Sequence, residues 1–285
     1  MSHILIAGCG KLGTPLGLQL VSDGQTVTGI KRRLTGNDHS AINWLALDIT
    51  QPDQYHQLPP SIDALIIILT PAERSVKGYQ TVYQHGVNQL LAHYGTADSR
   101  AWVLFVSATS VYGQQNGEWV DETSVTQPEQ YNGQSLLKAE QAVLKFNPDS
   151  VIVRFSGIYG AARSRVIKKL ESQQYIQQSP PVYSNRIHQD DCIAVLYFLI
   201  CEKLANNPLD SIYLATDYDC AEKFEVMSWL AKRAGLTPPI PEIAAEGAPQ
   251  NKRCSNKRLV ALGFSFKYAS YQEGYDAMLR SVNAK

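Results

Sequence analysis

The sequence has no surplus of charge of either sign, because 26 Lys and Arg residues balance 26 Asp and Glu residues over 285 positions. Proteins that bind nucleic acid through its phosphates usually carry a basic excess or a basic stripe. Docking to an anionic membrane surface likewise relies on a cluster of Lys and Arg. The neutral balance therefore argues against nucleic acid and membranes as partners.

Long apolar runs and paired cysteines are also missing. Nothing reaches the ~18 continuous apolar residues that a bilayer span needs. The first residues, MSHILIAGCG, have no basic stretch before a cleavable apolar segment, so we expect no secretory signal. The five scattered cysteines form neither a CxxC pair nor a zinc pattern with histidine. We therefore expect reduced thiols, no metal site and a cytoplasmic location.

Strand-like and helix-like segments alternate along the first part of the chain. Short β-branched or continuously apolar runs predict strands over residues 3–7, 26–30, 44–47, 64–69, 101–106 and 151–155. Helical patterns between them predict helices over 12–21, 76–93 and 135–146. Repeated strand–helix units indicate a parallel sheet with helices on both faces. We therefore predict an α/β fold built on a Rossmann-type doubly wound parallel sheet.

The alternation changes after about residue 160. Here the sequence predicts a helix over 190–202, a strand over 211–215 and short helices near 256–262 and 271–280. We interpret this irregular C-terminal part as a smaller α+β substrate domain. The predicted Rossmann domain comprises residues 1–160 with 186–216, and the substrate-binding part comprises 161–185 with 217–285.

A glycine loop follows the first predicted strand. Gly8, Gly10 and Gly13 form a GxGxxG pattern that includes Lys11 and Leu12 and opens a predicted helix. The first glycine permits a tight turn, the second lets backbone approach a pyrophosphate, and the third lets helix pack closely on strand. Unpaired N–H groups at the helix start would then face the phosphates. This context predicts a dinucleotide site, although a tight turn without a ligand would look similar.

The end of the second predicted strand carries cations instead of an acid. An NAD site normally places Asp or Glu there to accept from the ribose 2′-hydroxyl. This sequence has Lys31, Arg32 and Arg33. Because Arg can hold a phosphate with two parallel N–H bonds, the cluster favours NADP(H) over NAD(H). A solvated basic loop is the alternative.

Six further segments follow the glycine loop in order. They are Asp48-Ile49, Leu69-Thr70-Pro71, and residues 86–91, 107–113, 154–160 and 185–191. Together they resemble the extended short-chain dehydrogenase/reductase family, also called the NAD-dependent epimerase/dehydratase family, over essentially the whole chain. The resemblance implies a dinucleotide-binding domain, a small substrate domain and often a nucleotide-sugar substrate.

The same resemblance implies roles for individual residues. Asp48 and Ile49 match the family's adenine-binding pair, and Leu69, Thr70 and Pro71 match the loop that passes the cofactor ribose. We place Ser107 with the cofactor-binding residues as well.

The family's catalytic Tyr and Lys, spaced YxxxK on one helix, have no clear counterpart. Aligning Glu140 with the glutamate that follows the dyad in the family puts Asn132 at the Tyr position and Leu136 at the Lys position. A shift by one residue gives Tyr131 and Ser135, again without the Lys. The family's catalytic Ser/Thr position falls on Ala108, although Ser107, Thr109 and Ser110 are neighbours. The chain therefore resembles the atypical branch of the family, which lacks the standard dyad.

A substitute pair is conceivable on the same helix. Tyr131, Gln134, Ser135 and Lys138 form one helical stripe, and Tyr131 with Lys138 would be an acid/base pair, with Ser107 as a third candidate. A polar stripe facing solvent is the simpler interpretation.

Two functions follow from these features. The first is an NAD(P)-dependent epimerase/dehydratase-like oxidoreductase acting on a nucleotide-sugar or related polar metabolite. The alternative is a non-catalytic NADP(H)-binding sensor or interaction protein, which the missing Tyr and Lys would suit. We expect a small-molecule substrate and a monomer or homodimer.

Overall fold

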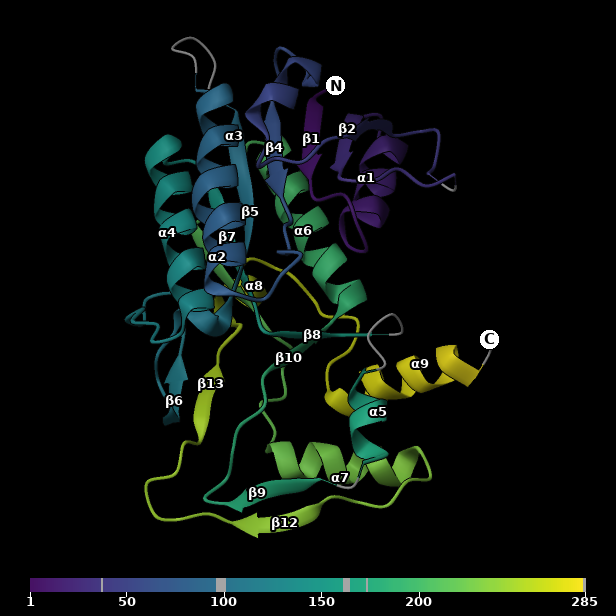
Figure 1. The fold of residues 1–285 in the computed structure, drawn as a ribbon. Coiled ribbons are helices and arrows are strands. Elements are labelled where there is room, and N and C mark those ends of the chain that lie inside the picture. Colours follow the sequence, from purple (N-terminus) through teal and green to yellow (C-terminus); the bar gives the residue numbers. More distant parts are fainter. Residues whose placement is uncertain (37, 96–100, 161–164, 173, 284–285) are drawn as a thin grey trace. The chain divides into compact units, whose positions relative to one another are not determined.

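The computed structural model describes residues 1–36, 38–95, 101–160, 165–172 and 174–283 (Figure 1). The chain divides into two compact units. Unit 1 comprises Met1–Val111, Thr126–Arg154 and Ile193–Tyr213, and unit 2 comprises Tyr112–Val125, Phe155–Cys192 and Leu214–Lys285. The division by compactness assigns 112–125, 155–160, 186–192 and 214–216 to unit 2, although the sequence places them in the Rossmann domain. The predicted boundaries concern which ligand each part binds and stay a prediction.

The described residues of the main sheet form seven strands in the order β11-β7-β5-β4-β1-β2-β3. The pairs β1–β2, β1–β4, β2–β3 and β4–β5 run parallel, which confirms the predicted Rossmann-type sheet. The central strands β1 and β4 are almost completely buried, as their continuous apolar runs require. The strands are β1 (His3–Ala7), β2 (Thr26–Lys31), β3 (Asn43–Ala46), β4 (Ala64–Ile67), β5 (Trp102–Ala108), β7 (Val151–Phe155) and β11 (Ile212–Ala215).

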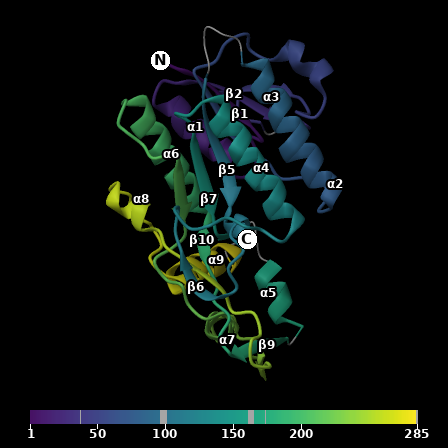
Figure 2. The same ribbon diagram turned by 90° about the vertical axis from the view of Figure 1, so that its left-hand side faces the viewer.

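Helices cover both faces of this sheet (Figures 1 and 2). The helices α1 (Gly13–Ser22) and α6 (Gln189–Leu204) lie on one face. The other face carries α4 (Tyr131–Phe146) and a helical segment made of α2 (Val76–Tyr79), η2 (Gln80–Gly86) and α3 (Val87–His93). None of the helices in the described part of the chain has the length and hydropathy of a membrane span.

Two predicted helices differ in detail from the observed ones. The segment predicted as one helix over 76–93 contains a π-helical stretch, η2. The helix predicted over 135–146 begins earlier, at Tyr131. Gly133, normally unfavourable in a helix, is accommodated because a Cβ there would lie 2.2 Å from the Ser110 carbonyl oxygen. Close packing of α4 on the loop after β5 thus requires glycine, which helix propensity does not reveal.

Unit 2 contains short strands, and helices over residues 165–170 and 223–233, that the sequence patterns did not predict. The helices predicted near 256–262 and 271–280 are confirmed. The strands of unit 2 pair as β10–β8, β12–β9 and β13–β6, joining segments far apart in the chain. Strands this short lack a readable period, so only their partners define them. The elements are β6 (Asn116–Val120), β8 (Gly157–Tyr159), α5 (Arg165–Leu170), β9 (Tyr175–Ser179), β10 (Arg186–His188), α7 (Lys223–Arg233), β12 (Ile240–Ile243), β13 (Asn251–Cys254), α8 (Lys257–Ala261) and α9 (Tyr271–Asn283). Outside both groups lie η1 (Pro52–Gln57) and η3 (Thr109–Val111) in unit 1.

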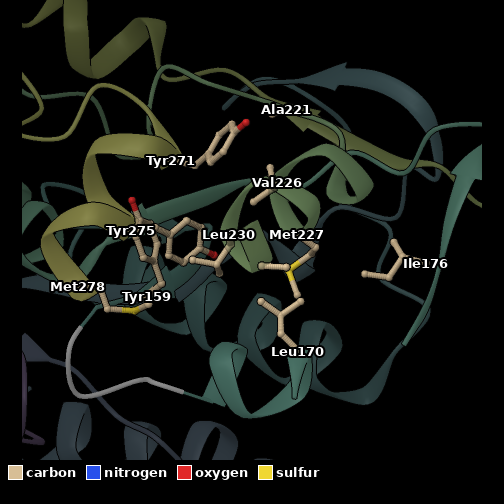
Figure 3. Packing of buried hydrophobic residues seen from close by; sticks show 11 residues of the cluster. Tyr159, Leu170, Ile176, Ala221, Val226, Met227, Leu230, Tyr271, Tyr275 and Met278 are labelled. Carbon is tan, nitrogen blue, oxygen red and sulfur yellow. The ribbon is translucent and has the colours of Figure 1, made fainter. Parts of the chain in front are cut away.

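A hydrophobic cluster joins the helices of unit 2 (Figure 3). Leu230 and Met227 on α7 pack with Tyr275 and Met278 on α9, and all four are at least nine-tenths buried. Tyr159 from β8 lies against Tyr275, with ring centroids 4.5 Å apart. This cluster gives unit 2 a core of its own.

Substituting Gly274 on α9 with alanine is expected to destabilise the protein by about 1–3 kcal/mol through overpacking. A Cβ there would lie 1.7 Å from the hydroxyl oxygen of Tyr159, whose ring is buried in the cluster. Helix propensity would predict the opposite sign, a gain of about 1 kcal/mol. Chemical denaturation decides between them, and the added change Tyr159→Phe should recover part of the loss.

Candidate functional site

The glycine loop lies where the connections of the sheet change direction. From β1 the chain continues to β2 on one side, while β4 pairs with the other side of β1. Ligands of such sheets bind outside the carboxyl ends of the strands at this point. Gly8 has φ +89°, and a Cβ on it would lie 2.0 Å from the Ile68 carbonyl oxygen. The loops after β1 and β4 therefore touch, and only glycine permits the contact.

The rest of the loop leaves open space at Gly10 and packs closely at Gly13. A Cβ on Gly10 would meet nothing nearer than the Gly8 carbonyl oxygen at 3.9 Å. At Gly13 it would lie 3.1 Å from the Ile6 side chain, so this glycine brings α1 close to β1. Helix α1 begins without a side-chain cap or an acid in its first turn. An uncapped helix start beside an open glycine suits the pyrophosphate of a dinucleotide.

The residues between these glycines divide into a buried and an exposed set. Leu12 and Cys9 are buried, and Lys11 is exposed. The Cys9 backbone N–H donates to the Ile30 carbonyl oxygen at 2.8 Å, tying the loop to the end of β2. Burial raises the pKa of the Cys9 thiol to about 11, so it stays protonated near neutral pH.

The cationic cluster after β2 is less available than the sequence suggests. The Lys31 ammonium forms an ion pair with Asp38 and lies 4.4 Å from the centroid of the Trp44 ring. Arg32 and Arg33 are exposed. The sequence reasoning missed Asp38 because it searched for an acid only at the strand end. The Thr35–Asp38 spacing, typical of a side-chain turn, was the available signal.

The predicted adenine and ribose residues lie after β3 and β4 in unit 1. Asp48 accepts from the backbone N–H and the hydroxyl of Thr50, at 3.0 and 2.8 Å. Ile49 is buried, whereas Thr70 is exposed. The Leu69 carbonyl oxygen accepts from the Tyr83 hydroxyl at 2.9 Å, and Pro71 is buried. The structure thus brings both segments to the carboxyl ends of the strands, where the glycine loop also lies.

Ser107 belongs to a buried polar cluster. Its hydroxyl donates to Glu140 at 2.5 Å, and Glu140 forms an ion pair with Arg154 at 2.7 Å. These three residues are 2–3% exposed and connect β5, α4 and β7. A hydroxyl held this way is already engaged as a donor, so the geometry favours a structural role for Ser107.

The helical stripe on α4 is only partly exposed. The Tyr131 hydroxyl donates to the Arg74 carbonyl oxygen at 2.9 Å, and Lys138, two turns further along, is exposed. Gln134 is exposed, but Ser135 is 2% exposed and accepts from the Gln84 amide at 3.3 Å. The interpretation of the stripe as solvent-facing is therefore wrong at Ser135. Gln84 comes from the π-helical stretch η2, which no sequence pattern pointed to.

The positions of the family dyad carry other side chains. Leu136, at the Lys position in one register, is 5% exposed and apolar. Asn132, at the Tyr position in that register, and Ala108 are half-buried. Across the residues that the structure describes, no three His, Cys, Asp or Glu side chains gather as a metal site would require.

Comparison with known proteins finds similarity along nearly the whole chain. The family model described as the RmlD substrate binding domain matches residues 1–283. Protein YeeZ of Escherichia coli strain K12 is 33% identical over 175 residues, which are 57% of this chain and 61% of YeeZ. The match thus spans about three fifths of the length of this curated relative.

Two solved structures share the fold. A Methylobacillus flagellatus protein with a provisional NAD-dependent epimerase/dehydratase assignment is 32% identical, with a TM-score of 0.80 and 99% of both chains covered. The UDP-glucuronic acid 4-epimerase of Bacillus cereus, solved in complex with NAD, is 19% identical. Its TM-score is 0.75, with 98% of this chain and 99% of that chain covered, and at this identity the likeness concerns the fold.

Proposed function

The chain belongs to the extended short-chain dehydrogenase/reductase family, and on that premise we propose that it is an NAD(P)-dependent epimerase/dehydratase-like oxidoreductase. The proposed substrate is a nucleotide-sugar or a related polar metabolite. The observation that carries the proposal is the glycine loop itself, in which Gly8 packs on the Ile68 carbonyl oxygen while Gly10, two residues further, has open space at its Cβ position. When bound there, the nicotinamide cofactor supplies hydride transfer.

The chain's own residues would bind and orient this cofactor. Gly8, Gly10 and Gly13 would let the backbone approach the pyrophosphate, beside Lys11 and Leu12 at the start of α1. Asp48 and Ile49 would contact the adenine, and the segment Leu69-Thr70-Pro71 would pass the ribose.

The proposed cofactor preference is NADP(H) over NAD(H), carried by the exposed Arg32 and Arg33. Replacing both with alanine should weaken NADPH binding about tenfold or more, since a hydrogen bond to a charged group contributes ~1.5–3 kcal/mol. NADH affinity should change little, because NADH has no 2′-phosphate. Fluorescence titration with both nucleotides checks this, and an unchanged affinity ratio would refute the preference.

Proton transfer is the part of the chemistry for which Tyr131 and Lys138 are proposed. The Tyr131 hydroxyl would have to leave the Arg74 carbonyl oxygen, and Lys138 would have to turn toward it. If they act as the acid/base pair, Tyr131→Phe and Lys138→Met should each lower kcat by ~10²-fold or more. Lys145→Met, an exposed lysine on the same helix, is the matched control. Unchanged rates in both variants would remove the pair from consideration.

A second candidate function is a non-catalytic NADP(H)-binding sensor or interaction protein. It is favoured by the buried Leu136 and Ser135, which occupy the two possible positions of the family's lysine. Turnover on a panel of nucleotide-sugars and carbonyl compounds, measured beside NADPH binding, separates the candidates. Turnover supports the enzyme, whereas tight binding without turnover on any compound supports the sensor.

A further inference from the structure

The end of β2 holds an ion pair inside the proposed cofactor site. Lys31 is the last residue of β2, eighteen positions after Gly13 in the sequence, where this fold recognises the ribose. Its ammonium contacts the Asp38 carboxylate and lies over the Trp44 ring. The side chains of Lys31 and Asp38 are 21% and 13% exposed. Both side chains of the pair are therefore partly buried.

The Asp38 carboxylate is held in place by its own loop. It accepts from the Thr35 backbone N–H at 2.7 Å and from the Thr35 hydroxyl at 3.1 Å. On the other side, the Trp44 indole N–H donates to the His39 carbonyl oxygen at 2.8 Å, which fixes the ring beneath Lys31. The hydrogen bond from Lys31 holds the pKa of Asp38 below its usual range, so the group is an anion near neutral pH.

We propose that Asp38 competes with the 2′-phosphate of NADP(H) for Lys31 and is therefore a specificity-determining residue of the cofactor site. This inference rests on the proposed dinucleotide function. A carboxylate already paired with Lys31 occupies the interaction that a phosphate would otherwise make. NAD(H), which carries a 2′-hydroxyl there, loses nothing by this pairing. The preference for NADP(H) would then come from Arg32 and Arg33, and Asp38 limits its size.

The test is a titration of the full chain and its Asp38→Asn variant with NADPH and NADH. Asparagine keeps the shape and can still accept from Thr35, but it leaves the Lys31 ammonium without its anion. We expect NADPH affinity to rise about tenfold and NADH affinity to stay within about threefold. Asp63→Asn removes the same charge beside the amino end of β4 and serves as the control.

A double-mutant cycle assigns the effect to the pair. The gain from Asp38→Asn should disappear when Lys31 is replaced by methionine, because the phosphate then has no ammonium to reach. Thermal melting of each variant shows that the fold is retained.

Three results would overturn the inference. If Asp38→Asn binds both nucleotides normally and its ratio of NADPH to NADH affinity is unchanged, Asp38 does not compete with the phosphate, and the proposed function still stands. A loss of NADH affinity in that variant would make Asp38 an acceptor for the ribose hydroxyl instead. Absence of dinucleotide binding by the unmodified chain would reject the proposed function, and the inference with it.

Discussion

Replacing Gly10 with valine is expected to abolish binding of NADPH and NADH while the fold and its thermal stability stay nearly unchanged. The protein has room for the new side chain, because the nearest atom to a Cβ there, among the described residues other than its two chain neighbours, is the Gly8 carbonyl oxygen at 3.9 Å. In the proposed complex the same space is where backbone meets pyrophosphate, so the branched side chain would displace the ligand. Calorimetric titration measures the loss of binding.

The neighbouring glycine offers a contrasting variant. A Cβ on Gly8 would lie 2.0 Å from the Ile68 carbonyl oxygen, and its φ of +89° strains any other residue. Gly8→Ala should therefore lower the melting temperature, which Gly10→Val should not. Normal NADPH affinity in a folded Gly10→Val protein would show that this loop does not hold the phosphates.

Replacing Arg154 with methionine is expected to lower the free energy of unfolding by about 3–5 kcal/mol, the usual cost of leaving one charge of a buried pair alone. The Arg154 and Glu140 side chains are 4% and 3% exposed, and two guanidinium nitrogens contact the carboxylate at 2.7 and 3.0 Å. Glu140 would keep only the Ser107 hydroxyl as a donor within this cluster. Urea denaturation monitored by circular dichroism gives the change.

An exposed pair provides the control for this prediction. Arg233 and Asp276 in unit 2 are 53% and 28% exposed, and Arg233→Met should cost about 1 kcal/mol or less. The double variant Glu140→Leu with Arg154→Met should be more stable than Arg154→Met, because no unpaired charge remains. Equal costs for Arg154→Met and Arg233→Met would contradict a stabilising role of the buried cluster.

The glycine loop is a feature that consecutive residues of the sequence are sufficient to predict. Strand β1, the three glycines and helix α1 are consecutive in the chain, so their roles follow from backbone conformation over a few residues. The same holds for β4, whose unbroken apolar run predicts burial on both faces. Residues Lys31 to Arg33 could be placed at a strand end for the same reason.

Long-range pairing limits what sequence patterns can predict. Strand β13 is recognisable only beside β6, where Asn251 lies opposite Asn116. Helix α4 begins at Tyr131, not Ser135, because the packing of Gly133 on the Ser110 backbone outweighs the low helix propensity of glycine. Ser135 is buried because Gln84 in another helix meets it. Each of these depends on a neighbour that is distant in sequence.

The sequence by itself determined the Rossmann type of the main sheet, the position of the glycine loop and the membership of the family, since these follow from consecutive residues and motif order. Only the tertiary structure decided which charged side chains form ion pairs with one another. It pairs Lys31 with Asp38 across a loop and encloses Glu140 with Arg154 between two elements. A charge acts on whatever lies near it in space, and that distance is set by the packing of the sheet and its helices.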